Sequence, residues 1–211
     1  MPIVLNEKLI EEVSPFLIKY GFDLLFAPRQ FRKIHSGGFC NVIVTVGNSL
    51  PALAELHVGI RLDLVEQLAY QFTTGLIEYG PHSTTLITSA GRIIGQPYHR
   101  FSLEHPSDIN TVAEQVRQFM QTDGFAFLEK YHRVEALDEL FNASPHESSP
   151  YLTNRLHRSL RGIILARLAY RSHWERLVTN YRAQLTLRGT PEAMMQNYDR
   201  LADYLRTFSV N

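Results

Sequence analysis

The chain has 211 residues, of which 45% are hydrophobic and 20% are charged, and its formal net charge at pH 7 is zero. This balance is typical of a globular protein and argues against a disordered chain, and the length suits one large domain or a domain with an extension. The single cysteine, Cys40, excludes an internal disulfide and fits a reducing compartment.

The first fifty residues carry no pattern for export or membrane insertion. Residues 1–12 have no basic segment followed by an apolar core, so we expect no secretory signal. Residues 34–54 contain no Asp, Glu, Lys or Arg, but glycines, asparagines and a proline interrupt them. Their alternation is that of strands and not of a membrane-spanning helix. We therefore expect a cytoplasmic protein that does not associate with a membrane.

A helix and two strands are predicted before the strongest pattern in the chain. Apolar residues recur at helical spacing near the N-terminus, which predicts a helix that is capped by Asn6 and ends at Gly21. The segments 22–26 and 30–35 have the composition of strands, and residues 36–38 form a turn into the next strand.

Residues 39–63 carry that strongest pattern. Two runs of alternating apolar and polar residues flank a short loop, which predicts two antiparallel strands. If Gly47 pairs with Leu53, four apolar pairs fall on one side of the hairpin, and a slip of one residue breaks all of them. The opposite side is polar, and Asn41 faces Gly59 there.

Helices and short strands follow the hairpin. The clearest helix runs from Ser107 or Asp108, as its cap, to Gly124, because a continuous apolar stripe lies between these two ends. The other predicted elements are a helix at 64–75, strands at 84–88, 92–94 and 99–103, and helical segments at 125–131 and 134–141.

Residues 142–150, with two prolines and three serines, form the best linker in the chain. Strand patterns stop after this linker. The predicted elements there are amphipathic helices at 152–168, with a break at Gly162, at 174–185 and at 191–208.

Together these elements predict an α+β fold. We expect a mostly antiparallel sheet of about five to seven strands with helices on one face, followed by a C-terminal helical subdomain. The expected organisation is a sheet module at 1–145 with residues 151–211 packed on it as one compact unit.

Charge is spread unevenly along the chain. Residues 1–150 hold 11 Lys and Arg against 17 Asp and Glu, whereas residues 151–211 hold 10 Arg against 4 Asp and Glu. Such asymmetry can indicate a basic face for nucleic acid or for an acidic partner. Alternatively, the basic helices dock on the acidic module of their own chain. We favour the interpretation within the chain, because a modest excess of basic residues on amphipathic helices is usually a solvated face.

No strong catalytic or cofactor motif is present. The nucleotide-binding patterns GxxxxGK[ST] and GxGxxG, the zinc and redox patterns HExxH and CxxC, and the hydrolase pattern GxSxG are all missing. Cys40 falls on the apolar side of the hairpin, where a thiol packs as a small hydrophobe and its pKa rises. We predict no catalytic residue, no metal site and no cofactor, and the question of enzymatic activity stays open.

A candidate ligand site lies on the polar side of the hairpin. Glu55, His57 and Arg61 share this side, and Gly59 leaves room for close approach by a ligand or another backbone. Arginine supplies paired donors that suit a carboxylate or phosphate. If residues 98–100 lie beside Gly59, the site is a cleft for a small anion. Alternatively, Gly59 marks a bulge, or this side is an ordinary solvated sheet surface. The further candidate residues are Tyr98, His99 and Arg100.

Three functions remain open. The favoured one is a non-enzymatic protein that binds an unidentified protein partner or a second copy of the chain, with Arg167, Arg171 and Arg182 as an exposed surface on the C-terminal helices. The second is a protein or enzyme that binds an anionic small molecule around His57 and Arg61. The third is nucleic-acid binding by the arginine-rich helices, which is least favoured because no DNA- or RNA-binding motif accompanies them.

Overall fold

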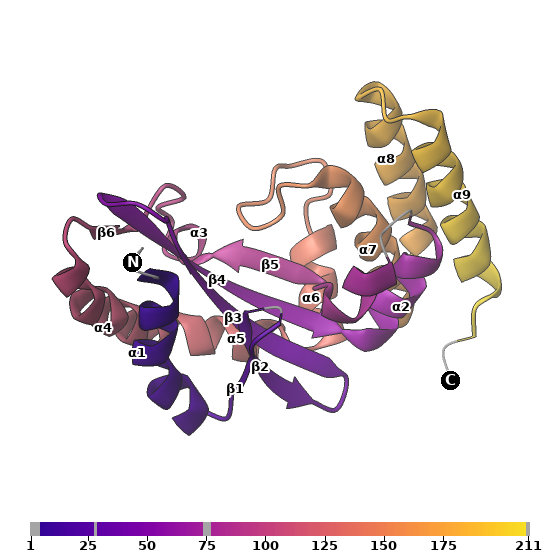
Figure 1. Cartoon of the computed structure of the whole chain (residues 1–211). Coiled ribbons are helices and arrows are strands. Elements are labelled where there is room, and N and C mark those ends of the chain that lie inside the picture. The colour runs from indigo at the N-terminus through magenta and orange to yellow at the C-terminus, as the bar shows by residue number, and fades with distance from the viewer. Residues whose placement is uncertain (1–4, 28, 74–76, 210–211) are drawn as a thin grey trace. The chain divides into compact units, whose positions relative to one another are not determined.

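The structure is a computed structural model that describes residues 5–27, 29–73 and 77–209. The chain divides into two compact units, which we call the sheet unit (residues 1–60 and 86–130) and the helical unit (residues 61–85 and 131–211). Figure 1 follows the chain through both. The C-terminal helices thus share a unit with two earlier segments, and the packing of 151–211 on a sheet module at 1–145 stays a prediction.

In the part of the chain that the structure describes, six strands form one antiparallel sheet, which confirms the predicted α+β class. The order across the sheet is β1-β2-β3-β4-β5, and β6 also pairs with β4, next to its N-terminal end. The strands are β1 (Asp23–Leu25), β2 (Gln30–His35), β3 (Gly38–Val46), β4 (Ala52–Leu62), β5 (Leu86–Ser89) and β6 (Phe101–Leu103).

The predicted central hairpin is β3 and β4. The backbone N–H of Gly47 donates to the Leu53 carbonyl at 3.1 Å, which confirms the expected pairing at the loop. The apolar side of both strands is buried, as the alternation requires. Cys40 lies there, 8% exposed, and burial raises its pKa to about 11, so the thiol is protonated at neutral pH.

Helices of the sheet unit cover this apolar side. The helix α1 (Leu5–Lys19) buries Leu9, Val13 and Leu17 and packs on β1, β3 and α4 (Ile109–Phe119). The predicted cap of α1, Asn6, instead lies inside the helix, and its side chain accepts a hydrogen bond from the Val46 backbone at 3.1 Å. This bond ties α1 to the end of β3.

Two predicted element boundaries in the sheet unit are wrong. Residues 92 and 93 of the expected strand at 92–94 belong to a short helix, α3 (Ala90–Ile93), whose first turn is capped by the Ser89 side chain. The expected helix end at Gly124 is a π-helical turn, Met120–Gly124, that continues into α5 (Phe125–Tyr131). A Cβ at position 124 would clash with Met120, so this glycine serves close packing and not a left-handed cap.

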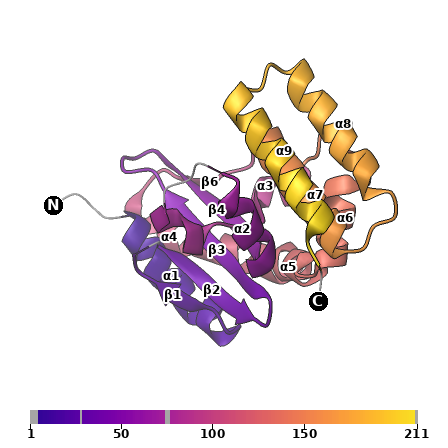
Figure 2. The same cartoon turned by 90° about the vertical axis from the view of Figure 1, so that its right-hand side faces the viewer.

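The helical unit is built around α7 (Arg155–Leu168), which packs against α2 (Asp63–Gln71), α6 (Val134–Asn142), α8 (Trp174–Leu187) and α9 (Glu192–Thr207). Figure 2 shows α7, α8 and α9 side by side. The helix α7 is not broken at Gly162, where the Asn142 and Tyr181 side chains pack closely. A 3₁₀ helix, Ile77–His82, follows α2. Gly75, the predicted end of the helix at 64–75, lies outside the described residues. None of the described helices is both long and apolar enough to cross a membrane.

Candidate functional site

Three of the predicted ligand residues meet on the polar side of the sheet. Glu55 and His57 lie two residues apart on β4, and the pairing of β6 with β4 brings Arg100 beside them. The Arg100 guanidinium donates through Nε to the Glu55 carboxylate, and His57 Nε2 lies 3.9 Å from the same carboxylate. Each of these side chains is partly exposed, between 28% and 38%.

The cluster consists of an ion pair between Arg100 and Glu55 beside the His57 imidazole, whose charged form is disfavoured. Burial lowers the pKa of His57, the Glu55 carboxylate acts to raise it, and the Arg100 charge lowers it further. Arg100 is also engaged by the carbonyls of His99 and Pro97. An incoming anion would therefore compete with Glu55 for the guanidinium.

The remaining predicted ligand residues are placed elsewhere. Tyr98 is 91% exposed, and His99 packs edge-on against Phe101, with ring centroids 5.1 Å apart. Gly59 faces Asn41, as predicted, but the space over it is filled, because a Cβ there would overlap the Asn41 side-chain oxygen. Asn41 in turn donates to Gln30 at 2.5 Å. A side chain of the next strand, and not a ligand, thus requires glycine at position 59.

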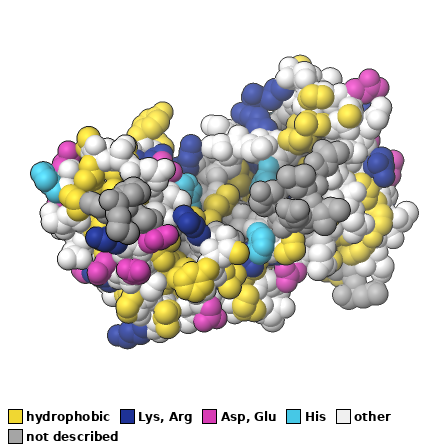
Figure 3. Space-filling model, in the orientation of Figure 1, with side chains coloured by type: hydrophobic (Ala, Val, Ile, Leu, Met, Phe, Trp, Pro, Cys, Tyr) yellow, Lys and Arg dark blue, Asp and Glu magenta, His cyan; other side chains and the backbone are white. Residues whose placement is uncertain are grey.

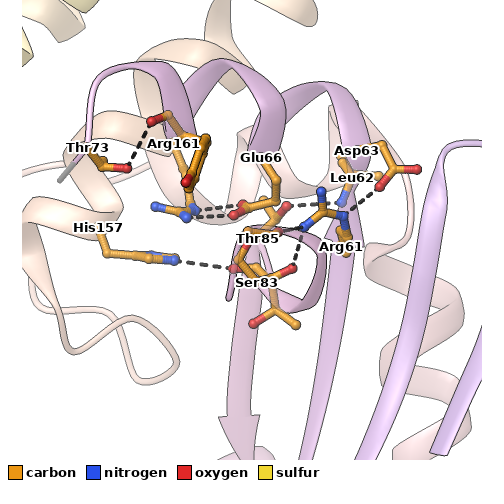
Figure 4. A network of polar contacts seen from close by, with 12 residues as sticks. Arg61, Leu62, Asp63, Glu66, Thr73, Ser83, Thr85, His157 and Arg161 are labelled. Carbon is orange, nitrogen blue, oxygen red and sulfur yellow. Dashed lines mark hydrogen bonds and ion pairs between the residues drawn. The ribbon is translucent and has the colours of Figure 1, made fainter. Parts of the chain in front are cut away.

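Arg61 belongs to the helical unit and is only 7% exposed. Its Nε donates to Asp63 at 2.5 Å, and its Nη1 donates to the Gly80 carbonyl at 2.8 Å and to Ser83 at 2.9 Å (Figure 4). The sequence prediction grouped Arg61 with Glu55 and His57 only because alternate residues of a strand share one side. A buried guanidinium needs several acceptors, and these come from the segment that ends the 3₁₀ helix.

Figure 4 also shows a buried ion pair that the sequence analysis missed. Arg161 of α7 donates to both oxygens of Glu66 of α2, at 2.7 and 2.6 Å. Burial acts to raise the pKa of Glu66, but the hydrogen bonds and charge of Arg161, helped by Ser83 and His157, hold it below its ordinary value. The two partners lie 95 residues apart in the chain, and no local pattern links them.

The arginines predicted as an interaction surface are used within the helical unit. Arg167 donates to the carbonyls of Leu205 and Phe208, at 3.0 and 2.6 Å, and thereby caps the end of α9. Arg171 donates to Asp138 at 2.6 Å and to Glu139 at 2.7 Å. Arg182 pairs with Asp199 in solvent.

Counted by unit, the charge asymmetry disappears. The sheet unit holds 9 Lys and Arg against 10 Asp and Glu, and the helical unit holds 12 against 11. Arg161 and Arg171 pair with carboxylates that precede residue 151. These two arginines of the basic helices thus pair with acidic groups of their own unit, whereas docking on an acidic module at 1–150 stays a prediction.

A groove of about 660 Å³ lies between α1 and β1 in the sheet unit. Its wall is largely apolar, with Ile10, Pro15 and Ile18 from α1 facing Leu24 of β1 and the following Phe26. Phe26 is 81% exposed and Ile18 is 55% exposed. Figure 3 shows hydrophobic side chains exposed beside acidic ones over this part of the molecule.

Charged side chains border the same groove. Glu7 and Glu11 lie on the α1 side, and Arg29 follows β1. Arg29 and Glu7 approach to 3.9 Å, but both side chains are more than half exposed, so their attraction is weak. The groove therefore combines an apolar wall with a polar rim. The sequence analysis did not predict this groove, although Ile10 and Ile18 lie outside the apolar stripe by which the helix was recognised.

Within the residues that the structure describes, no group of three or more His, Cys, Asp and Glu side chains is arranged to hold a metal ion. Comparison of the chain with protein-family models, with curated proteins and with solved structures finds no match in any of the three.

Proposed function

We propose that this chain is a non-enzymatic binding protein that recognises another polypeptide through the α1/β1 groove of the sheet unit. The observation that carries this proposal is the exposure of Phe26 and Ile18 beside a groove of about 660 Å³. Large aromatic and aliphatic side chains inside a polar rim are the arrangement found at protein–protein contacts.

The groove replaces the arginine-rich helices as the proposed interaction surface. Arg167 and Arg171 are held by carbonyls and carboxylates of the helical unit, so recruiting them to a partner would break existing bonds. Phe26 and Ile18 are exposed apolar side chains, so a partner can cover them without breaking hydrogen bonds. Burying one large apolar side chain contributes about 1.5–3 kcal/mol to the free energy of binding.

Photo-crosslinking from within the groove tests this function. A photoreactive phenylalanine analogue replaces Phe26, and in a matched control it replaces Leu187, which is 86% exposed on α8. We expect the Phe26 position to crosslink a discrete polypeptide in cells of the source organism. Unlabelled protein should compete for that product, and an Ile18→Asp variant should not. Equal labelling from the two positions would refute the proposal.

A second candidate function is the binding of a small anion by the Glu55–His57–Arg100 cluster, which the structure assembles on the sheet. A thermal-shift series with phosphate and with short carboxylic acids tests it. Ligand at about one hundred times its dissociation constant stabilises the folded protein by ~2.7 kcal/mol. A shift that is lost in Arg100→Ala supports this candidate, and no shift at millimolar concentrations excludes it.

A further inference from the structure

The groove lies along an open edge of the sheet. β1 is the first strand in the sheet order and pairs with β2, and no other described strand pairs with it. Leu9 and Val13 of α1 are buried, and Ile10, which is also largely buried, lines the groove together with the exposed Ile18. α1 and β1 lie side by side at the rim of the sheet (Figures 1 and 2). The outer side of β1 is thus not paired with any strand that the structure describes.

From this arrangement we propose that the groove receives an extended segment of a partner protein, which adds to the outer edge of β1 as a strand. We further propose that this segment carries apolar side chains at alternate positions and a Lys or Arg next to them. This inference rests on the proposed function, since it names the kind of partner that the groove takes.

The backbone of β1 supplies the first contribution. In an antiparallel pair, successive residues direct their N–H and C=O groups alternately toward the partner strand and away from it. Within Asp23–Leu25, the groups that are not directed at β2 therefore face the open edge of the sheet. Such an edge binds an added strand through main-chain hydrogen bonds, independently of the strand's sequence.

The apolar wall specifies the spacing of the side chains. Ile10 and Ile18 are separated by eight residues, or about 12 Å along a helix. Residues two apart in a strand are about 7 Å apart, so this wall spans roughly three alternate positions of an added strand. The side chains in the middle of the wall, Ser14 and Pro15, are smaller than the isoleucines at its two ends. We expect the largest partner side chains at the two outer positions.

The charge of the rim specifies the basic residue. Glu11 is exposed, and among the residues that the structure describes no Lys, Arg or His pairs with it. The Glu11 carboxylate thus offers an acceptor to a cationic side chain at the groove.

Peptide display tests this inference. A random twelve-residue library is selected on the wild-type protein and depleted on Ile18→Asp, with Leu187→Asp as the matched control. We expect enriched peptides with three alternate apolar positions and a neighbouring Lys or Arg. A synthetic copy should bind about tenfold or more weaker to Ile18→Asp. It should also bind several-fold weaker to Glu11→Gln, with unchanged binding to Glu192→Gln, an exposed acid on α9.

The binding mode is tested on the peptide itself, so folding of a variant does not enter. N-methylation of alternate backbone amides should abolish binding in one register and spare it in the other, and amide NMR shifts should centre on Asp23–Leu25. Enriched peptides with apolar residues three and four apart, insensitive to N-methylation, would overturn the strand mode while the groove remains a binding site. A dimer that Ile18→Asp disrupts would overturn the partner segment in favour of a second copy. Enrichment that is equal on Ile18→Asp would overturn both this inference and the proposed function.

Discussion

Glu66 and Arg161 form a bidentate ion pair between α2 and α7, with the Glu66 side chain 1% exposed and the Arg161 side chain 11% exposed. Paired hydrogen bonds to both carboxylate oxygens satisfy the charge of each group. α2 follows directly from the last residues of β4. The pair therefore fixes the segment that leaves the sheet to the central helix of the helical unit.

Arg161→Ala should destabilise the helical unit by about 3–5 kcal/mol, because it leaves the Glu66 carboxylate buried without its partner. Urea unfolding followed by the fluorescence of Trp174, the only tryptophan in the chain and a residue of α8, measures this loss. The double variant Glu66→Met with Arg161→Met should recover most of it, since two apolar side chains leave no uncompensated charge. A single variant within about 1 kcal/mol of wild type would contradict the buried pair.

His157 should make the same unit sensitive to acid. Burial and the Arg161 charge lower its pKa to about 4, against the opposing effects of Glu66 and the Thr84 carbonyl. The unfolded chain, with an ordinary pKa near 6.5, therefore binds a proton between pH 6.5 and 4 that the folded chain does not. The free energy of unfolding is therefore not reduced by His157 above pH 6.5. It decreases as the pH falls through this window, by about 3 kcal/mol at pH 4.

The control for this pH dependence is His157→Gln, which removes the titrating group. The difference in unfolding free energy between wild type and variant should shrink or reverse in favour of the variant as the pH falls from 7 to 4. Parallel pH profiles of the two proteins would show that His157 is not held neutral.

Gly59→Ala should destabilise the sheet unit by about 1–3 kcal/mol through overpacking. Its Cβ would overlap the Asn41 oxygen and lie 3.2 Å from the Leu86 carbonyl. Gly47→Ala is the matched control in the same hairpin, because its Cβ meets neighbours only at 3.7 Å or more. In a double-mutant cycle, Asn41→Ala should relieve part of the Gly59→Ala cost. Additive costs would mean that Asn41 is not the cause.

The hairpin of β3 and β4 was predictable because its alternation covers both strands, and a slip of one residue would expose a row of apolar side chains. The same periodicity placed Glu55 beside His57. The periodicity could not predict the partners of the Arg61 side chain, since the acceptors Gly80 and Ser83 lie in a segment without a periodic pattern. Contacts between distant segments leave no trace in a local pattern.

Helix boundaries and the groove were less predictable for different reasons. Gly124 has the composition of a helix end, but packing against Met120 decides its role. α1 was recognised from its buried stripe, whereas Ile10 and Ile18 form a second stripe that gains meaning only beside the edge of β1. That edge follows from the order of strands, which pairing across the whole sheet determines.

Arg171 and Arg182 differ in what the removal of each side chain leaves behind. Arg171→Ala takes a donor from Asp138, whose side chain is 7% exposed and keeps one hydrogen bond from Asn142 at 2.7 Å. We expect a loss of about 1–3 kcal/mol, the cost of a buried acceptor that loses a partner. Arg182→Ala breaks an ion pair in solvent with Asp199, so Trp174-detected unfolding should show no measurable change. If instead Arg182→Ala weakened binding to an oligonucleotide in a salt-dependent way, the exposed arginine would act as a phosphate contact, and the nucleic-acid hypothesis would return.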